Sequence, residues 1–347
     1  MHIFVSGGTG YIGSVLVPHL VERGHKVTVL DRFYFGNTLK ELAEAKPASV
    51  QVIHGDTRSF DPKLLAGVDA VIDLAGISND PACELDAALT RSINVDGGRR
   101  LAELAQKAGI RRYVYSSSCS VYGHGETKGL TETSHPNPVS LYAHAKRELE
   151  EALLDLGAQS KGSFEPVILR LATVFGVSPR MRFDLAINIM TKNAYMAHRI
   201  VVDGGGRQWR PFVHVGDVAA AFALACESEA RLVAGQTFNV GSTACNVQIL
   251  NLAFRVRELI ASTEVVHSPT DPDLRDYNVA FEKIEQTLDY RAKVTIEDGV
   301  AEVLNALKIG ALDPDERRWY TLRHYRFLVD AEQVMRDIGI SGRLLST

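Results

Sequence analysis

The first half of the chain alternates short, continuous apolar runs with longer stretches of helical character. Five apolar runs have the length and composition of buried strands, at residues 3–5, 26–30, 50–54, 70–76 and 113–116. Helical stretches cover about residues 87–108 and 142–156. Strands that alternate with helices form parallel sheets with right-handed crossovers. The pattern therefore predicts an α/β fold with a doubly wound parallel sheet.

A glycine-rich turn follows the first apolar run. Residues 6–13 have the sequence SGGTGYIG, and the second apolar run ends at Asp31. Glycines permit a tight turn and let backbone N–H groups approach a pyrophosphate at the positive end of the following helix. A strand, glycine turn, helix, second strand and acidic residue in this order indicate a dinucleotide-binding unit. The alternative is an ordinary turn between a strand and a helix.

The residues after the second run bear on the choice of cofactor. Asp31 can accept hydrogen bonds from both adenosine ribose hydroxyls, and its charge would repel the 2′-phosphate of NADP. The neighbouring Arg32 could pair with that phosphate, or it is a solvated loop charge. The carboxylate favours NAD over NADP.

Composition and charge narrow the classes of function. The 347 residues carry a formal net charge of −4, which does not favour nucleic acid or an anionic membrane as a partner. The four cysteines form no CxxC pair, so we expect neither a disulfide framework nor a metal site. No apolar stretch approaches the ~20 residues that span a bilayer. The first run begins at His2, without room for a signal peptide, so we expect a cytoplasmic protein.

The second half of the chain alternates less regularly. We expect a cofactor-binding domain over residues 1–165, with returning segments near 210–245. A smaller substrate-binding domain is expected over residues 166–347. The tail after Leu312 is charged and aromatic, and we expect it to pack as an appended helix.

A serine, a tyrosine and a lysine are spaced for acid–base chemistry. Tyr142 and Lys146 are four residues apart and share a face of the predicted helix. Ser116, Ser117 and Ser118 follow the fifth run, at the strand end where such sheets bind ligands. The lysine ammonium and a nicotinamide cation lower a tyrosine pKa from about 10, and a serine hydroxyl holds the reacting oxygen. Ser118, Tyr142 and Lys146 therefore predict reversible oxidation of an alcohol on NAD.

Taken together, these motifs resemble the extended short-chain dehydrogenase/reductases of the nucleotide-sugar epimerase/dehydratase family. The resemblance extends from Gly7 to about Gly299. Its matching pieces are the glycine turn, residues 55–56 (GD), 74–76 (LAG), Asn94, 116–123 (SSSCSVYG), 142–146 (YAHAK) and 210–217 (RPFVHVGD). The resemblance implies a Rossmann fold, NAD as cofactor and a nucleotide-diphospho-sugar as substrate.

The resemblance also implies roles for individual residues. Tyr142 would be the catalytic base, Lys146 the ribose-binding residue that lowers its pKa, and Ser118 the third catalytic residue. Asp56 would contact adenine. The expected cofactor-binding residues are Gly7, Gly10, Tyr11, Ile12, Gly13, Asp31, Arg32, Asp56, Thr57, Leu74, Ala75, Gly76, Asn94, Ser116, Tyr142 and Lys146.

Arginines are expected to hold the substrate diphosphate, because bidentate charge-assisted bonds grip it firmly. Arg210 matches a family arginine with this role, and Arg275 matches another; for each, the alternative is a surface ion pair. Arg180 and Arg182 add two cations nearby, with loop solvation as the alternative. The expected substrate-binding residues are Ser78, Ser118, Cys119, Ser120, Thr173, Arg180, Arg182, Asn188, Arg210 and Arg275.

Three departures from the family pattern bear on the reaction. Family 4,6-dehydratases carry Asp-Glu where this chain has Cys119 and Ser120, which disfavours dehydration. Galactose-type epimerases have an asparagine where this chain has Thr173. Residues 170–185, with Asn188 following, resemble a subgroup that acts on nucleotide-activated heptoses, including dehydrogenases that oxidise carbon 4 of a GDP-heptose.

The predicted function is that of an NAD-dependent nucleotide-diphospho-sugar epimerase acting through a 4-keto intermediate. The alternative is a heptose 4-dehydrogenase that releases the keto-sugar. An NADPH-dependent keto-sugar reductase would have Arg32 as its signature, but Asp31 argues against it. A non-enzymatic NAD sensor is less favoured, because Tyr142 and Lys146 are both present. Alanine and leucine on a second face of the helices at 87–108 and 142–156 favour a homodimer.

Overall fold

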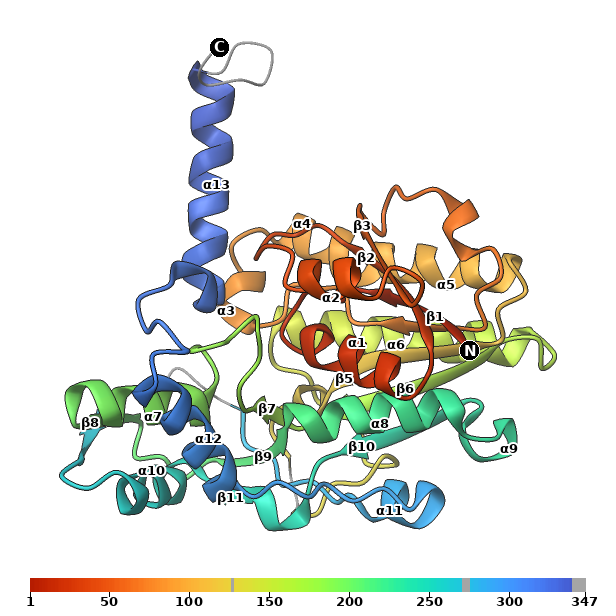
Figure 1. Cartoon of the computed structure of the whole chain (residues 1–347). Coiled ribbons are helices and arrows are strands. Elements are labelled where there is room, and N and C mark those ends of the chain that lie inside the picture. The colour runs from red at the N-terminus through yellow and green to blue at the C-terminus, as the bar shows by residue number, and fades with distance from the viewer. Residues whose placement is uncertain (126–127, 270–274, 339–347) are drawn as a thin grey trace.

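A computed structural model of the chain describes residues 1–125, 128–269 and 275–338. At its centre lies a seven-stranded sheet in the order β10-β6-β5-β4-β1-β2-β3, and every neighbouring pair is parallel (Figure 1). The predicted doubly wound parallel sheet is therefore confirmed. Its strands are β1 (His2–Ser6), β2 (Lys26–Asp31), β3 (Val50–His54), β4 (Ala70–Asp73), β5 (Arg112–Ser118), β6 (Glu165–Leu171) and β10 (Gln236–Val240).

Helices cover both faces of this sheet. The main ones are α1 (Gly13–Glu22) and α8 (Val215–Glu227) on one face, and α5 (Gly98–Lys107) and α6 (Leu141–Gln159) on the other. Successive strand side chains point to opposite faces. In β1, Ile3 and Val5 accordingly join the core under α1 and α8, whereas Phe4 joins the core under α5 and α6.

The predicted helix over residues 87–108 is interrupted, which corrects the expectation. The segment comprises α4 (Ala87–Arg91), a π-helical stretch at Ser92–Gly97, and α5. The wider turn places the Asn94 amide against the backbone of Ile77: it accepts from the Ile77 N–H at 2.8 Å and donates to the Ile77 carbonyl at 2.9 Å. Single π-helical turns inside helices are frequent at functional sites.

A smaller unit stands below the central sheet in Figure 1, around a core that includes Phe175, Phe212 and Leu252. Its elements are β7 (Thr173–Phe175), β9 (Trp209–His214) and β11 (Asn246–Gln248) in one sheet, β8 (Arg199–Asp203) and β12 (Glu264–Ser268) in another, and α7 (Ala186–Ala197), α10 (Ile249–Leu259) and α12 (Ile296–Lys308).

The chain passes between the two parts more than once. Residue 165, where we expected the first domain to end, is the first residue of the central strand β6. α8 and β10 lie within the expected returning segments, and β10 pairs with β6 at the edge of the central sheet. The remaining short helices are α2 (Lys40–Ala45), α3 (Asp80–Cys83), α9 (Ala230–Val233) and α11 (Glu282–Leu288), with helical turns at Pro62–Leu65, Cys119–Tyr122, Thr243–Cys245 and Arg317–Trp319.

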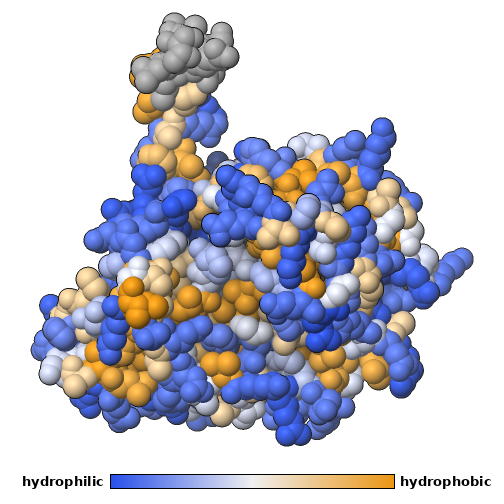
Figure 2. All heavy atoms as spheres, viewed as in Figure 1, coloured by the Kyte–Doolittle hydropathy of each residue, from blue (hydrophilic) through white to orange (hydrophobic). Residues whose placement is uncertain are grey.

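The tail forms the helix α13 (Thr321–Ile338), which projects from the body of the molecule (Figure 1). Thr321 and His324 at its start are buried, whereas Phe327 and Ile338 further along are exposed, and apolar side chains show on the projecting part in Figure 2. The helix therefore packs only through its first turns. None of the helices in the described ranges is long and apolar enough to cross a membrane.

Candidate active site

A cavity of about 620 Å³ lies beyond the carboxyl ends of the central strands, where the strand order reverses between β1 and β4. The sequence pattern predicted that ligands bind at the carboxyl ends of these strands. The expected residues that line the cavity are Gly7, Gly10, Tyr11, Ile12, Gly13, Asp31, Arg32, Asp56, Thr57, Leu74, Ala75, Gly76, Ser78, Ser116, Ser118, Ser120, Tyr142, Lys146, Thr173, Arg180, Arg182, Arg210 and Arg275.

Three expected contact residues lie behind this wall instead. Cys119 is fully buried, and its thiol donates to the carbonyl oxygen of Arg170 at 3.3 Å. Asn188 is also fully buried and donates to the carbonyl oxygen of Arg182 at 2.9 Å. The Asn94 amide is engaged by the loop after β4, as described above. These three side chains do not line the cavity but shape its wall from behind, and their contact with a ligand stays a prediction.

The glycine turn fits a dinucleotide pyrophosphate. Gly7 has φ +69°, and a Cβ there would lie 2.9 Å from backbone atoms of Ala75, so only glycine lets the turn pass this close to the end of β4. A Cβ on Gly13 would collide with the backbone of Gly8. The first turn of α1 also contains no acidic residue. No acidic side chain at the start of α1 would therefore repel an anion at the positive end of this helix.

Asp31 is fixed at the end of β2 by the backbone around it. Its Oδ2 accepts from the Thr9 N–H at 3.0 Å, and its Oδ1 accepts from the Phe33 N–H at 2.8 Å. Each carboxylate oxygen keeps a further lone pair for a ribose hydroxyl. Arg32 lies at the rim, with 48% of its side chain exposed.

Asp56 shares its carboxylate with a neighbouring arginine that sequence reasoning did not consider. The Arg58 guanidinium donates to both Asp56 oxygens, at 2.9 and 2.7 Å, and this contact lowers the pKa of Asp56. Arg32 adds a longer ion pair at 3.7 Å. The carboxylate is therefore held ionised where it lines the cavity.

Ser118, Tyr142 and Lys146 come together on adjoining elements. Ser118 ends β5, while Tyr142 and Lys146 lie in the first two turns of α6, whose start is capped by Ser140. Burial raises the pKa of Tyr142, while the charge of Arg182 and a hydrogen bond with Ser118 oppose that rise. Burial also lowers the pKa of Lys146 to about 8.

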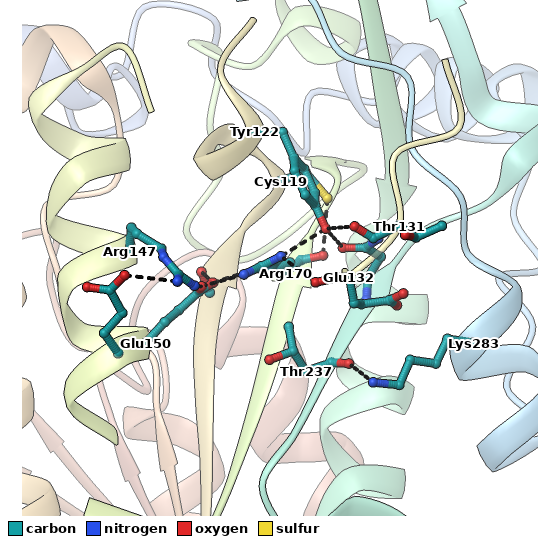
Figure 3. Close-up of polar contacts among 12 residues, drawn as sticks. Cys119, Tyr122, Thr131, Glu132, Arg147, Glu150, Arg170, Thr237 and Lys283 are labelled. Carbon is teal, nitrogen blue, oxygen red and sulfur yellow. Dashed lines mark hydrogen bonds and ion pairs between the residues drawn. The ribbon is translucent and has the colours of Figure 1, made fainter. Parts of the chain in front are cut away.

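A buried ion pair supports these residues from behind (Figure 3). Glu150 follows Lys146 by one turn of α6 and is fully buried. Its carboxylate accepts from Arg170 on β6 at 3.0 and 2.8 Å and from the Ser117 hydroxyl on β5 at 2.5 Å. Arg170 also donates to the Tyr122 hydroxyl at 3.0 Å. The ends of β5 and β6 are thereby tied to the helix that carries Tyr142.

Arginines from the second part of the chain border the cavity. Arg182 forms a two-point pair with Asp184 at 3.2 and 2.5 Å. Burial alone would raise the pKa of Asp184, but Arg182 holds it at about 2. Arg275 pairs with Asp80 at 2.7 Å, and Arg210 is 4% exposed. A carboxylate already fixes the guanidinium of Arg182 and that of Arg275, which orients their other donors.

Several lining residues were not anticipated. Asp80 lies in the polar segment after β4, and its position after a strand end was a usable signal. Tyr34 and Phe35 belong to the loop after β2. Leu322 and Tyr325 come from α13, and nothing in the spacing of the tail pointed to the cavity.

Comparison with known proteins identifies the family. The model of the NAD dependent epimerase/dehydratase family matches residues 3–241, more than half of the chain. This chain belongs to that family. NAD is accordingly its cofactor, as the glycine turn and Asp31 predicted. Within the described part of the chain, no group of His, Cys, Asp and Glu residues could hold a metal ion.

The family includes enzymes with different outcomes. The chain is 26% identical over 331 residues to UDP-glucose 4-epimerase of Bacillus subtilis, covering 87% of this chain and 95% of that one. It is 28% identical over 333 residues to dTDP-glucose 4,6-dehydratase of Streptomyces niveus, covering 92% and 95%. Among solved structures, UDP-glucuronic acid 4-epimerase of Bacillus cereus, in complex with UDP-glucuronic acid and NAD, superimposes with a TM-score of 0.78 at 25% identity over 89% of this chain and 99% of that one.

Proposed function

We propose that this family member is a nucleotide-diphospho-sugar epimerase that acts through a 4-keto intermediate. The observation that carries the proposal is that Ser118, Tyr142 and Lys146 line the same cavity as the glycine turn. Bound NAD would supply a hydride acceptor for the sugar carbon and, in its reduced form, a hydride donor. The protein must then hold the sugar hydroxyl and move its proton.

The proton is moved by Tyr142. Its phenolate takes the proton of the C4 hydroxyl while Ser118 holds the oxygen, and the phenol returns that proton when the ketone is reduced. Burial raises the pKa of Tyr142, so the phenolate depends on nearby cations. Lys146 places its ammonium 5.7 Å from the centre of the Tyr142 ring.

Charge and polarity indicate which of the lining residues would bind the substrate. Arg182, Arg210 and Arg275 would bind the diphosphate, because guanidinium groups match its oxygens in a bidentate manner. Ser78, Ser120 and Thr173 would face the sugar.

Dehydration is disfavoured by the residues beside Ser118. Elimination of water needs an acid and a base at positions occupied by Cys119 and Ser120. The Cys119 thiol is turned toward the Arg170 carbonyl, and burial raises its pKa. No carboxylate stands at either position.

A 4-dehydrogenase that releases the keto-sugar is the second candidate. It is favoured by residues 170–185, which resemble the heptose-specific subgroup. The two outcomes share every step up to the ketone, and they differ in whether the ketone leaves before it is reduced.

The deciding experiment uses nucleotide-sugars labelled with deuterium at C4. Purified enzyme is incubated with GDP-, UDP- and dTDP-linked hexoses and heptoses, and the products are analysed by mass spectrometry. An epimerase gives a product of unchanged mass that retains the label. A dehydrogenase gives a product lighter by the transferred label and one proton, with the label on NADH. Loss of water from the sugar would contradict both.

We also propose a homodimer paired through α5 and α6. Leu104 on α5 and Ala152 and Leu156 on α6 pack against the core under these helices but remain half-buried in the single chain. A helix that is apolar on a second face usually buries that face as well. Light scattering at micromolar concentration should give twice the chain mass, and Leu156→Glu should shift it to the monomer. A monomeric wild-type protein would contradict the proposal.

A further inference from the structure

The first turns of α13 touch three segments that border the cavity. Leu322 and Tyr325 pack in the cluster that contains Tyr142. His324 Nε2 lies 2.6 Å from the carbonyl oxygen of Tyr34, in the loop after β2. Thr321 reaches the loop after β7. This contact pattern makes the start of α13 a part of the cavity wall.

Thr321 holds a buried arginine in place. Its hydroxyl accepts from Arg180 Nη2 at 3.0 Å and donates to Asp184 Oδ1 at 3.1 Å. The Arg180 guanidinium lies 3.7 Å from the centre of the Phe35 ring, and the residue is 3% exposed. The Thr321 hydroxyl thus fixes one edge of the Arg180 guanidinium, and the Phe35 ring covers one of its faces.

Arg180 lines the cavity, and its nearby carboxylate, Asp184, is linked to it through the Thr321 hydroxyl rather than by a direct ion pair. Across the residues that the structure describes, no carboxylate oxygen lies within 4.0 Å of its guanidinium nitrogens, whereas Arg182 has Asp184 as its partner. Burial, and then the like charge of Arg182, lower the pKa of Arg180 to about 9. A buried cation in this situation favours an anionic ligand, which restores its charged state.

The surroundings of Arg180 indicate which anion. Ser178, two residues earlier, donates to the carbonyl oxygen of Tyr11 at 2.8 Å, so this loop rests on the glycine turn. On its other side, Phe35 follows Asp31 by four residues. Arg180, beside Arg182, therefore lies between the loop that rests on the glycine turn and the loop that follows Asp31, and both of these loops border the dinucleotide site.

We propose that the first turn of α13 belongs to the NAD site: Thr321 holds Arg180 over the cofactor pyrophosphate and thereby slows release of the cofactor. His324 and Tyr325 assist by holding the loop that carries Phe35, the Tyr325 and Phe35 rings being 5.3 Å apart. The proposal rests on NAD as the cofactor and not on the epimerase outcome. It reassigns Arg180 from the substrate diphosphate to the cofactor.

The test compares Thr321→Val with Thr321→Ser in the full chain. Valine keeps the shape and removes both hydroxyl contacts, while serine keeps the hydroxyl. Release of NADH is measured by its fluorescence after mixing with excess NAD. We expect release about tenfold faster, or more, in Thr321→Val, because a hydrogen bond to a charged group is lost, and a rate close to wild type in Thr321→Ser. Wild-type release from Thr321→Val would overturn the proposal.

A double-mutant cycle separates this role from simple packing. Arg180→Gln should also speed NADH release, and Thr321→Val/Arg180→Gln should release NADH no faster than Arg180→Gln alone, since Thr321 acts through Arg180. If Thr321→Val fails to fold, the rate of NADH release from Arg180→Gln tests the proposal instead. Unchanged NADH release with weakened binding of UDP or GDP in Arg180→Gln would return Arg180 to the substrate and overturn the proposal.

Discussion

The ammonium of Lys146 donates a hydrogen bond to the carbonyl oxygen of Ser116 at 2.7 Å. This bond joins the second turn of α6 to the end of β5, so the lysine is held in place by the protein itself. Its two other N–H donors remain for a ribose. The position of the charge relative to Tyr142 is therefore set before any ligand binds.

Tyr142→Phe should lower turnover about 10²- to 10⁴-fold, because it removes only the hydroxyl that transfers the proton. NAD binding should change little, since the ring that contributes to the cavity wall is kept. Both quantities can be measured on one preparation, by product formation and by NADH fluorescence. Turnover above half of the wild-type value would exclude Tyr142 as the base.

Lys146→Met should move the acidic limb of the kcat/KM profile to higher pH. The ammonium stabilises the Tyr142 phenolate, so its removal raises the pKa at which the base forms. In the wild-type enzyme, kcat/KM should also fall as the pH rises above about 8, where Lys146 loses its proton. This alkaline fall should be absent from the methionine variant. An unshifted acidic limb would show that Lys146 does not act on the pKa of Tyr142.

Asp31→Asn should weaken NAD binding and reduce the preference for NAD over NADP. The amide keeps the size of the side chain but removes the charge that repels a 2′-phosphate. Arg32→Ala is the matched control, because Arg32 at the rim offers the opposite charge. Arg32→Ala should weaken NADP binding relative to the wild-type protein and leave NAD binding nearly unchanged. An unchanged cofactor ratio in Asp31→Asn would place the selectivity elsewhere.

Glu150→Gln should lower the free energy of unfolding by about 3–5 kcal/mol, because it leaves the buried Arg170 without its counter-charge. Glu151→Gln on the same helix is the control: its side chain is 57% exposed, so the cost should stay within about 1 kcal/mol. Chemical denaturation of both variants gives the comparison. Equal stabilities would show that the Glu150–Arg170 pair contributes little.

The sequence was most informative where local pattern and motif coincide. The glycine turn, Asp31 and the Tyr142–Lys146 pair each lie within one strand–turn or one helix, so spacing alone placed them, and all line the cavity. Local pattern did not show the π-helical turn that directs Asn94 to the loop after β4. Nor did it show which way Cys119 points, because this depends on a carbonyl from β6.

Contacts between distant parts of the chain were beyond such reasoning. Thr321 and Arg180 are 141 residues apart, and no periodicity or motif connects them. Glu150 and Arg170 are closer in sequence, yet their pairing depends on α6 crossing the sheet beside β6. Such partners are set by tertiary packing, so only the folded structure brings them together.

The interleaved course of the chain also constrains how the protein can be made. β6 is buried along its whole length, but its partner β10 is the last strand of the central sheet to be synthesised, at Gln236–Val240. Until the ribosome has passed residue 240, the nascent chain presents β6 as an open, apolar edge, the kind of surface that recruits other strands. A fragment that stops between residues 172 and 235 contains β6 but not β10, so it should aggregate rather than bind NAD, although it includes the whole glycine turn together with Ser118, Tyr142 and Lys146.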